Sequence, residues 1–152
     1  MSDVDVIECQ AIPTAVFKGK TAFPELSATI RKGMDNVYAM LPSLNVAPHG
    51  HNVVVYKGSL APGSTADIEV GVIVARAFDK TGDVEPSTLP AGEAIRTVHV
   101  GPYFELRRAN LRLQDWLVAN GRRQTGVSWE IYGDWNDDQS KLETEIYIQL
   151  QP

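Results

Sequence analysis

Cysteine and long apolar runs are almost absent from this sequence. Cys9 is the one cysteine among 152 residues, so no disulfide can form within the chain, and we expect a reducing, cytoplasmic compartment. No apolar run approaches the roughly 18 residues that a membrane-spanning helix requires. The acidic start, residues 1–5, has no apolar signal core. We therefore expect no membrane partner.

Positive charge is also scarce. The chain has 14 Lys and Arg against 19 Asp and Glu, a formal net charge of −5. Its densest basic groups are Arg107-Arg108 with Arg112, and Arg122-Arg123, and they form no continuous stripe. Binding to nucleic acid through its phosphates needs such a stripe. The charge balance therefore argues against direct nucleic-acid binding and favours cationic partners.

Motifs for cofactors and metals are missing as well. The sequence has no nucleophile elbow, no phosphate-binding loop and no dinucleotide-binding glycine pattern. His49 and His51 flank Gly50, but a zinc site needs three or four ligands. His99 stands before Gly101-Pro102 and is expected to be held there by packing or a hydrogen bond. We therefore expect no cofactor and no metal.

What the sequence does contain is an internal repeat at an offset of 76 residues. Gly50, Tyr56 and Glu69 recur as Gly126, Tyr132 and Glu145. Further upstream the offset becomes 77, since Ile12-Pro13 matches Leu89-Pro90. Several matches in one register indicate a duplicated unit. The chain, residues 1–152, is thus expected to be a single domain of two repeats, about 4–78 and 84–150.

Each repeat has the pattern strand, helix, strand, strand. In the first helix, apolar residues recur at spacings of three and four, and Pro42 and Pro48 are expected to end it. The expected strands are 4–18, 51–58, 66–78, 91–99, 127–134 and 141–150; the expected helices are 24–41 and 101–119, and 78–89 is a surface connection. Two such units predict an α+β fold, a tandem βαββ duplication in which one antiparallel sheet carries both helices on one face. The opposite face would then form a ligand cleft along the pseudo-twofold axis.

Alternation along the strands selects residues for that cleft. We expect the bulkier apolar set around Trp129 to pack on the helices, so that Glu130 and Tyr132 point into the groove. The same reasoning on 143–150 selects Glu145 and Tyr147. The candidate ligand-binding residues are therefore Tyr56, Glu130, Tyr132, Glu145 and Tyr147, joined by Trp135, whose indole lies either at the cleft rim or simply on the surface.

These residue types suit an organic cation. A carboxylate in a half-dry aromatic cleft is unfavourable unless it is paired. A bound cation provides that pairing, and each aromatic face adds roughly 0.5–2 kcal/mol of cation–π attraction. The alternative is that the glutamates and tyrosines are merely the solvated side of a sheet.

Several pieces of the second half together resemble a known family. They are Leu89-Pro90-Ala91-Gly92, His99-Val100-Gly101-Pro102-Tyr103, Trp116, Trp129-Glu130-Ile131-Tyr132 and Glu143-Thr144-Glu145-Ile146-Tyr147-Ile148. This combination resembles the GyrI-like small-molecule-binding domain, also called the AraC-type effector-binding domain, with the first half as a more divergent repeat. The resemblance implies that Glu130 is the acid that pairs with lipophilic cations and Tyr132 the aromatic residue two places on.

The resemblance leaves three functions open. The first is a binding protein that senses or sequesters lipophilic, cationic, drug-like molecules; because only residues 1–4 precede the first strand, we expect no DNA-binding domain and a separate regulator chain as partner. The second is a cofactor-independent hydrolase of strained cyclopropane rings, with Glu130 and Tyr132 as the catalytic pair. The third is an interaction protein that protects DNA gyrase. A monomer and a homodimer are equally compatible with the sequence.

Overall fold

The computed structural model describes residues 4–46 and 49–152, so the expectations for residues 1–3 and Pro48 lie outside the described residues. The side chain of His49 lies outside them as well. The strands are β1 Asp5–Cys9, β2 Ile12–Thr21, β3 His49–Gly58, β4 Ala66–Val74, β5 Val84–Leu89, β6 Gly92–Val100, β7 Gln124–Tyr132 and β8 Glu143–Leu150. The helices are α1 Leu26–Leu44 and α2 Leu106–Asn120, with short 3-10 turns η1 Phe23–Glu25, η2 Tyr103–Glu105 and η3 Gln139–Lys141. None of the helices in these described ranges is long and apolar enough to cross a bilayer.

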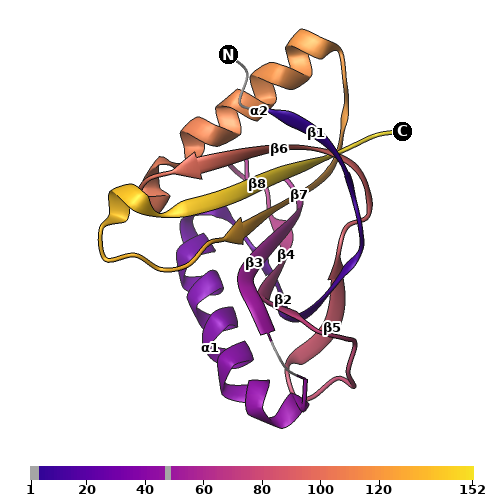
Figure 1. The fold of residues 1–152 in the computed structure, drawn as a ribbon, viewed down its shortest axis with the longest axis vertical. Coiled ribbons are helices and arrows are strands. Elements are labelled where there is room, and N and C mark those ends of the chain that lie inside the picture. Colours follow the sequence, from indigo (N-terminus) through magenta and orange to yellow (C-terminus); the bar gives the residue numbers. More distant parts are fainter. Residues whose placement is uncertain (1–3, 47–48) are drawn as a thin grey trace.

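All eight strands form one antiparallel sheet in the order β1-β6-β8-β7-β3-β4-β2-β5. Strands at equal distances from the two ends of this order are equivalent in the two repeats: β1 and β5, β6 and β2, β8 and β4, and β7 and β3. A pseudo-twofold axis therefore passes between β7 and β3. Helix α1 packs on β2 and β4, and α2 packs on β6 and β8 (Figure 1). Both helices cover the same face of the sheet. Residues directly opposite each other on neighbouring strands share a face, and the register connects Ile146, which packs under α2, through Glu130 to Val54, which packs under α1. The predicted fold class is confirmed.

The outermost strands are exchanged between the repeats. Strand β1 precedes β2 in the chain but pairs with β6, while β5 precedes β6 but pairs with β2. The two long stretches β1–β2 and β5–β6 therefore pair side by side in one antiparallel register, from Asp5 opposite Arg96 to Phe17 opposite Val84, and this two-stranded ribbon crosses from one half of the sheet to the other (Figure 1). The prediction that 78–89 is only a connection was wrong, since Val84–Leu89 is a strand. Its proline, Pro86, hid the strand pattern; an edge strand tolerates proline because one side of its backbone is unpaired.

The register corrects the alignment of the two repeats. Lys18 lies opposite Glu69 and Val98 lies opposite Glu145. Because Glu69 and Glu145 are equivalent, Lys18 and Val98 are equivalent too, which gives an offset of 98 − 18 = 80 rather than the predicted 77. Helix α1 has 19 residues and α2 has 15, and this difference of four accounts for the change from 80 to 76.

Helix α1 continues three residues beyond its predicted end. It includes Pro42 and ends at Leu44, where Asn45 adopts a left-handed conformation with φ 54°. Proline costs most in a helix interior, and in the last turn it removes only one intrahelical hydrogen bond. Asparagine tolerates the left-handed conformation that ends many helices.

The central strands are buried on both faces, which the sequence pattern did not reveal. Trp129 is 2% exposed and packs with Val53 and Val55 against Leu89 and Ala94, on the face away from the helices. Leu89 and Ala94 belong to the crossing β5–β6 stretch, which covers that face. The prediction that the Trp129 set packs on the helices was therefore wrong, because the crossing strands supply a second apolar surface for it.

Candidate ligand-binding site

Glu130 lies beside the pseudo-twofold axis on the helix-bearing face, held by two tyrosines. One carboxylate oxygen, Oε1, accepts a hydrogen bond from the hydroxyl of Tyr132 at 2.6 Å and another from Tyr56 at 2.9 Å. Tyr132 lies two residues along β7 and therefore shares its face. Tyr56 lies two residues beyond Val54, the residue of β3 opposite Glu130. The strand pairing thus brings together three residues that the sequence selected.

Burial and hydrogen bonding act in opposite directions on this carboxyl group. Burial raises the pKa of Glu130 above its ordinary value, and the hydrogen bonds from Tyr132 and Tyr56 offset part of that increase. Burial and then the negative charge of Glu130 raise the pKa of both tyrosines well above 10.0. Both hydroxyls therefore remain protonated donors near neutral pH, and the carboxyl group remains the one titratable member of the cluster.

An open pocket of about 510 Å³ lies next to this cluster, between α1 and the end of β7. Its wall is mostly apolar, and Tyr132 connects it to Glu130. The ring of Tyr103, from η2, meets the ring of Tyr132 edge to face at 5.4 Å and 80°. The lining residues are Ser27, Ile30, Arg31, Met34, Asn52, Tyr103, Tyr132, Gly133 and Trp135.

The pocket lies on the face that carries the helices, so the expected groove on the opposite face was wrong. The physical reason is the crossing of the two long strand stretches, which fills that opposite face with Trp129 and its neighbours. On the helix side, α1 and α2 are separated along the sheet, which leaves the axis uncovered by a helix. Glu130 and Tyr132 lie on this side because they have the opposite strand parity to Trp129. Tyr132 lines the pocket, whereas Glu130 and Tyr56 lie behind its hydroxyl and are not part of the lining.

Trp135 has both of the positions that the sequence left open. It lines the pocket, and the residue is 65% exposed. Its indole nitrogen donates to Asp137 at 3.2 Å. The same turn is joined to β3 by His51 and Asp134, whose side chains are 3.1 Å apart. Trp135 is thus an exposed rim residue.

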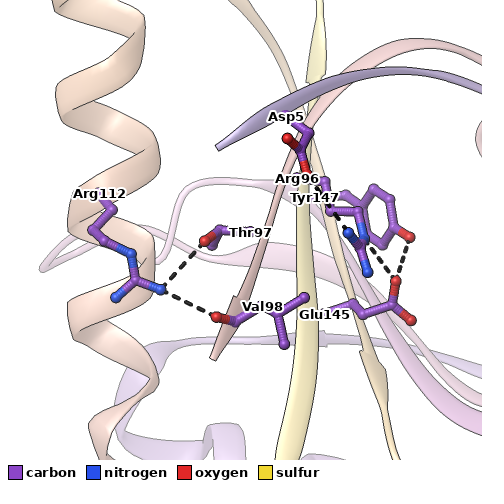
Figure 2. A network of polar contacts seen from close by, with 7 residues as sticks. All are labelled: Asp5, Arg96, Thr97, Val98, Arg112, Glu145 and Tyr147. Carbon is purple, nitrogen blue, oxygen red and sulfur yellow. Dashed lines mark hydrogen bonds and ion pairs between the residues drawn. The ribbon is translucent and has the colours of Figure 1, made fainter. Parts of the chain in front are cut away.

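Glu145 and Tyr147 lie on the other face of the sheet, which contradicts their expected place beside Glu130. Tyr147 lies opposite Trp129 in the sheet and stacks on its ring at 5.0 Å. Its hydroxyl donates to Glu145 at 2.9 Å, and Arg96 Nε donates to the same oxygen at 2.7 Å (Figure 2). Burial and the bond to Glu145 raise the pKa of Tyr147 to about 12. This network is a paired structural cluster, closed off from the pocket.

Several pocket residues were missed by sequence reasoning. Ile30 and Met34 belong to the apolar stripe of the first helix, yet both also line the pocket. Tyr103 was part of the family pattern but received no role; its position directly after Gly101-Pro102, at the start of a helix near the axis, was the available signal. Ser27, Arg31, Asn52 and Gly133 carried no sequence signal for this role.

The remaining histidine and metal candidates can be placed directly. His99 is 5% exposed, and its Nε2 lies 3.1 Å from the carbonyl oxygen of Pro102, the packed helix-entry position expected for it. Within residues 4–46 and 49–152, no three His, Cys, Asp or Glu side chains gather in a group that could hold a metal ion.

The fold and the pocket define a class, a duplicated α+β domain with a small-molecule cleft at its axis. A family model described as the GyrI-like small molecule binding domain matches residues 2–151. The chain therefore belongs to the GyrI-like family. No curated protein matches it.

Solved structures of three relatives share the fold. The EcmrR C-terminal domain is 20% identical with a TM-score of 0.76, and the match covers 97% of this chain and 96% of that one. In an EcmrR–DNA complex the match is 22% identical with a TM-score of 0.77, and this chain spans only 57% of EcmrR. SAV2435 bound to tetraphenylphosphonium is 10% identical with a TM-score of 0.70, over 97% and 93%. A hydrolase from Listeria innocua is 12% identical with a TM-score of 0.63, over 98% and 92%.

Proposed function

We propose that this domain binds a lipophilic organic cation with aromatic groups in the pocket between α1 and β7. The observation that carries the proposal is that Glu130 has hydroxyl partners but no cationic partner. It is partly buried beside an apolar pocket, and its hydrogen-bond partners are two neutral tyrosines. Among the described residues, no Lys, Arg or His forms an ion pair with it.

An unpaired carboxylate in such a place is unfavourable, and a bound cation removes the cost. The rings of Tyr132, Tyr103 and Trp135 present aromatic surface to the pocket, and each face in contact with a cation adds roughly 0.5–2 kcal/mol. Arg31 also lines the pocket, but its side chain is exposed on α1, where water and salt screen its repulsion. The proposal gains support from SAV2435, whose structure holds tetraphenylphosphonium, a lipophilic cation.

The test is calorimetric titration with tetraphenylphosphonium on three proteins: wild type, Glu130→Gln and the matched control Glu145→Gln. Both glutamates lie on sheet strands and accept a tyrosine hydrogen bond, but Glu145 is paired with Arg96 on the far face. We expect Glu130→Gln to weaken binding at least about tenfold, which corresponds to about 1.4 kcal/mol, and Glu145→Gln to leave it unchanged. Equal loss in both variants, or none in Glu130→Gln, would contradict the proposal.

One observation favours a second function, hydrolysis of a strained ring. Tyr132 Oη lies 2.6 Å from a carboxyl group whose pKa is raised by burial, a geometry suited to general acid–base catalysis. Glu130 would take a proton from water while the water oxygen bonds to a ring carbon. The strained carbon–carbon bond breaks, and Tyr132 protonates the carbon that leaves.

Mass spectrometry separates the two functions. A cyclopropane-containing natural product that gains the mass of one water with wild type, but not with Glu130→Gln or Tyr132→Phe, identifies a hydrolase. An unchanged mass beside measurable binding identifies a binding protein. Gyrase protection, a separate regulator chain as partner, action without a DNA-binding domain and a cytoplasmic location all stay predictions of the sequence.

A further inference from the structure

Three large apolar side chains are exposed to solvent on the outer face of α2 and on the η2 turn before it. Phe104 is 80% exposed, Leu111 is 51% exposed and Val118 is 85% exposed. Leu111 and Val118 are seven residues apart within α2 and therefore lie along one line on the helix. Phe104 precedes Leu111 by the same number of residues and lies on η2, at the amino end of the helix. None of them lines the pocket. Exposed apolar residues that are aligned on one face indicate a contact surface, whereas single scattered ones do not.

Two opposite charges lie within the same line. Arg107 is four residues before Leu111 and Asp115 is four residues after it, so both share its face. Both are exposed, and no hydrogen bond or ion pair joins either to another described residue. The face is therefore apolar along its length, positive toward the amino end of α2 and negative toward the carboxyl end.

We propose that two copies of this chain pair through this face, with their α2 helices antiparallel and Leu111 on the twofold axis. Phe104 and Val118 are each seven residues from Leu111, so Phe104 of one copy meets Val118 of the other. Arg107 and Asp115 are each four residues away, so Arg107 meets Asp115 at both ends. A parallel arrangement would place Arg107 on Arg107, so the charges select the antiparallel one. Such a self-complementary contact closes as a dimer.

The equivalent face of α1 does not repeat this pattern, although the two helices share an offset of 80. Phe104, Leu111 and Val118 are replaced by Pro24, Arg31 and Tyr38. Each chain therefore presents one such surface, and association stops at two copies.

The surface is small. It extends over 15 residues, from Phe104 to Val118, and these 14 steps of 1.5 Å correspond to about 21 Å of helix. Contacts confined to one helix pair fall short of the roughly 800 Å² per partner of a standard interface. We therefore expect a reversible dimer that dissociates on dilution.

Sedimentation equilibrium from micromolar to millimolar concentration tests the proposal. Wild type is expected to pass from monomer to dimer, while Leu111→Asp stays monomeric with an unchanged thermal melt, since Leu111 is outside the core. Phe23→Asp serves as the matched control, because Phe23 is also a large, exposed apolar residue, 67% exposed, but lies on η1. Wild type that stays monomeric at millimolar concentration, or a dimer that Leu111→Asp leaves intact, would overturn the proposal.

Charge reversal tests the antiparallel geometry. Arg107→Asp places two carboxylates together at each end of its own dimer, and Asp115→Arg places two guanidinium groups there, so each variant alone is expected to be monomeric. Mixed in equal amounts, the two variants replace these like-charge contacts by opposite-charge ones and are expected to form a heterodimer. A mixture that stays monomeric would overturn this geometry. Tetraphenylphosphonium titrations of the variants keep this test independent of the proposed function, since neither residue lines the pocket.

Discussion

Glu130 differs from three other sheet glutamates, Glu69, Glu93 and Glu145, in the groups that it is bonded to. Glu69 pairs with Lys57 at 2.6 Å, Glu145 pairs with Arg96 at 2.7 Å, and Glu93 pairs with Arg122. Glu130 has only hydroxyl donors. A hydroxyl stabilises a carboxylate without cancelling its charge, so this residue alone among the four keeps a negative charge available to a ligand.

Binding of a permanent cation is expected to depend on pH through Glu130. The cation favours the ionised carboxylate, and burial has raised the pKa of this group. Affinity for tetraphenylphosphonium should therefore fall as the pH drops through the raised pKa, at a higher pH than an ordinary glutamate would give. Titrations between about pH 8 and about pH 5 measure this, since the ligand itself does not titrate. Glu130→Gln should show a flat profile, and a flat wild-type profile would contradict the assignment.

Stability should depend on pH in the opposite sense. The carboxyl group of Glu130 has a higher pKa in the folded state than in the unfolded state, so ionisation favours the unfolded chain. The resulting cost is absent below the ordinary glutamate pKa and develops as the pH rises through the raised one. Without ligand, Glu130→Gln should match wild type near about pH 4 and become relatively more stable toward about pH 8. Thermal melts across that range give the comparison, and a difference that shrinks with rising pH would refute it.

At the scale of elements, α1 depends on a glycine where it crosses the sheet. A Cβ atom on Gly33 would lie 2.9 Å from Val70 Cβ and 3.1 Å from Phe17 Cδ1. Val70 has no room to withdraw, because it is fully buried in β4. The equivalent position in α2 is Leu113, so α1 approaches its strands more closely than α2 does.

Gly33→Ala should therefore push α1 away from the sheet. Overpacking costs about 1–3 kcal/mol, which exceeds the gain of about 1 kcal/mol from replacing a helical glycine by alanine. Urea denaturation should show a net loss of stability, and tetraphenylphosphonium should bind more weakly because Ile30 and Met34 move with the helix. Ser43→Ala, an exposed change in the same helix, is the control. A Gly33→Ala protein that is more stable than wild type would show that α1 and β4 leave room for a Cβ atom at this position.

The sequence predicted the bounds of the helices and strands better than it predicted which face of the sheet each side chain lies on. Helical spacing and strand alternation placed both helices and most strands to within a few residues, and repeat matching plus family resemblance selected Glu130, Tyr132 and Tyr56. Alternation states which residues share a face but not which face carries the helices. The large apolar residue Trp129 suggested the wrong face for Glu130 and Tyr132. Glu145 and Tyr147, which do lie away from the helices, were therefore wrongly grouped with them. Partners such as β5 depend on strand exchange, which leaves no local signal.

For the whole molecule, strand exchange makes the two repeats interdependent. Strand β1 pairs with β6 and β5 pairs with β2, so each repeat lacks one strand of its own sheet. The far-face core is also divided between them, with Val53 and Val55 from one repeat and Trp129 and Ala94 from the other.

Separate fragments, residues 4–80 and 81–152, are therefore expected to be unfolded alone and to recover native secondary structure when mixed. Circular dichroism of each fragment and of the mixture measures this. As a control, tetraphenylphosphonium binding should return only in the mixture. A fragment that folds cooperatively alone would show that the exchange contributes little to stability.

The position of Glu130 has a consequence for how such a site can arise at all. Val54 and Glu130 are equivalent in the two repeats and lie directly opposite each other across the axis. In a true homodimer of a single repeat, that pair would consist of two identical residues, either two valines without charge or two carboxylates that repel each other. Joining the repeats in one chain removes this constraint. Gene fusion thus permits a single unshared carboxylate at the axis, which matches the single positive charge of the ligand that we propose.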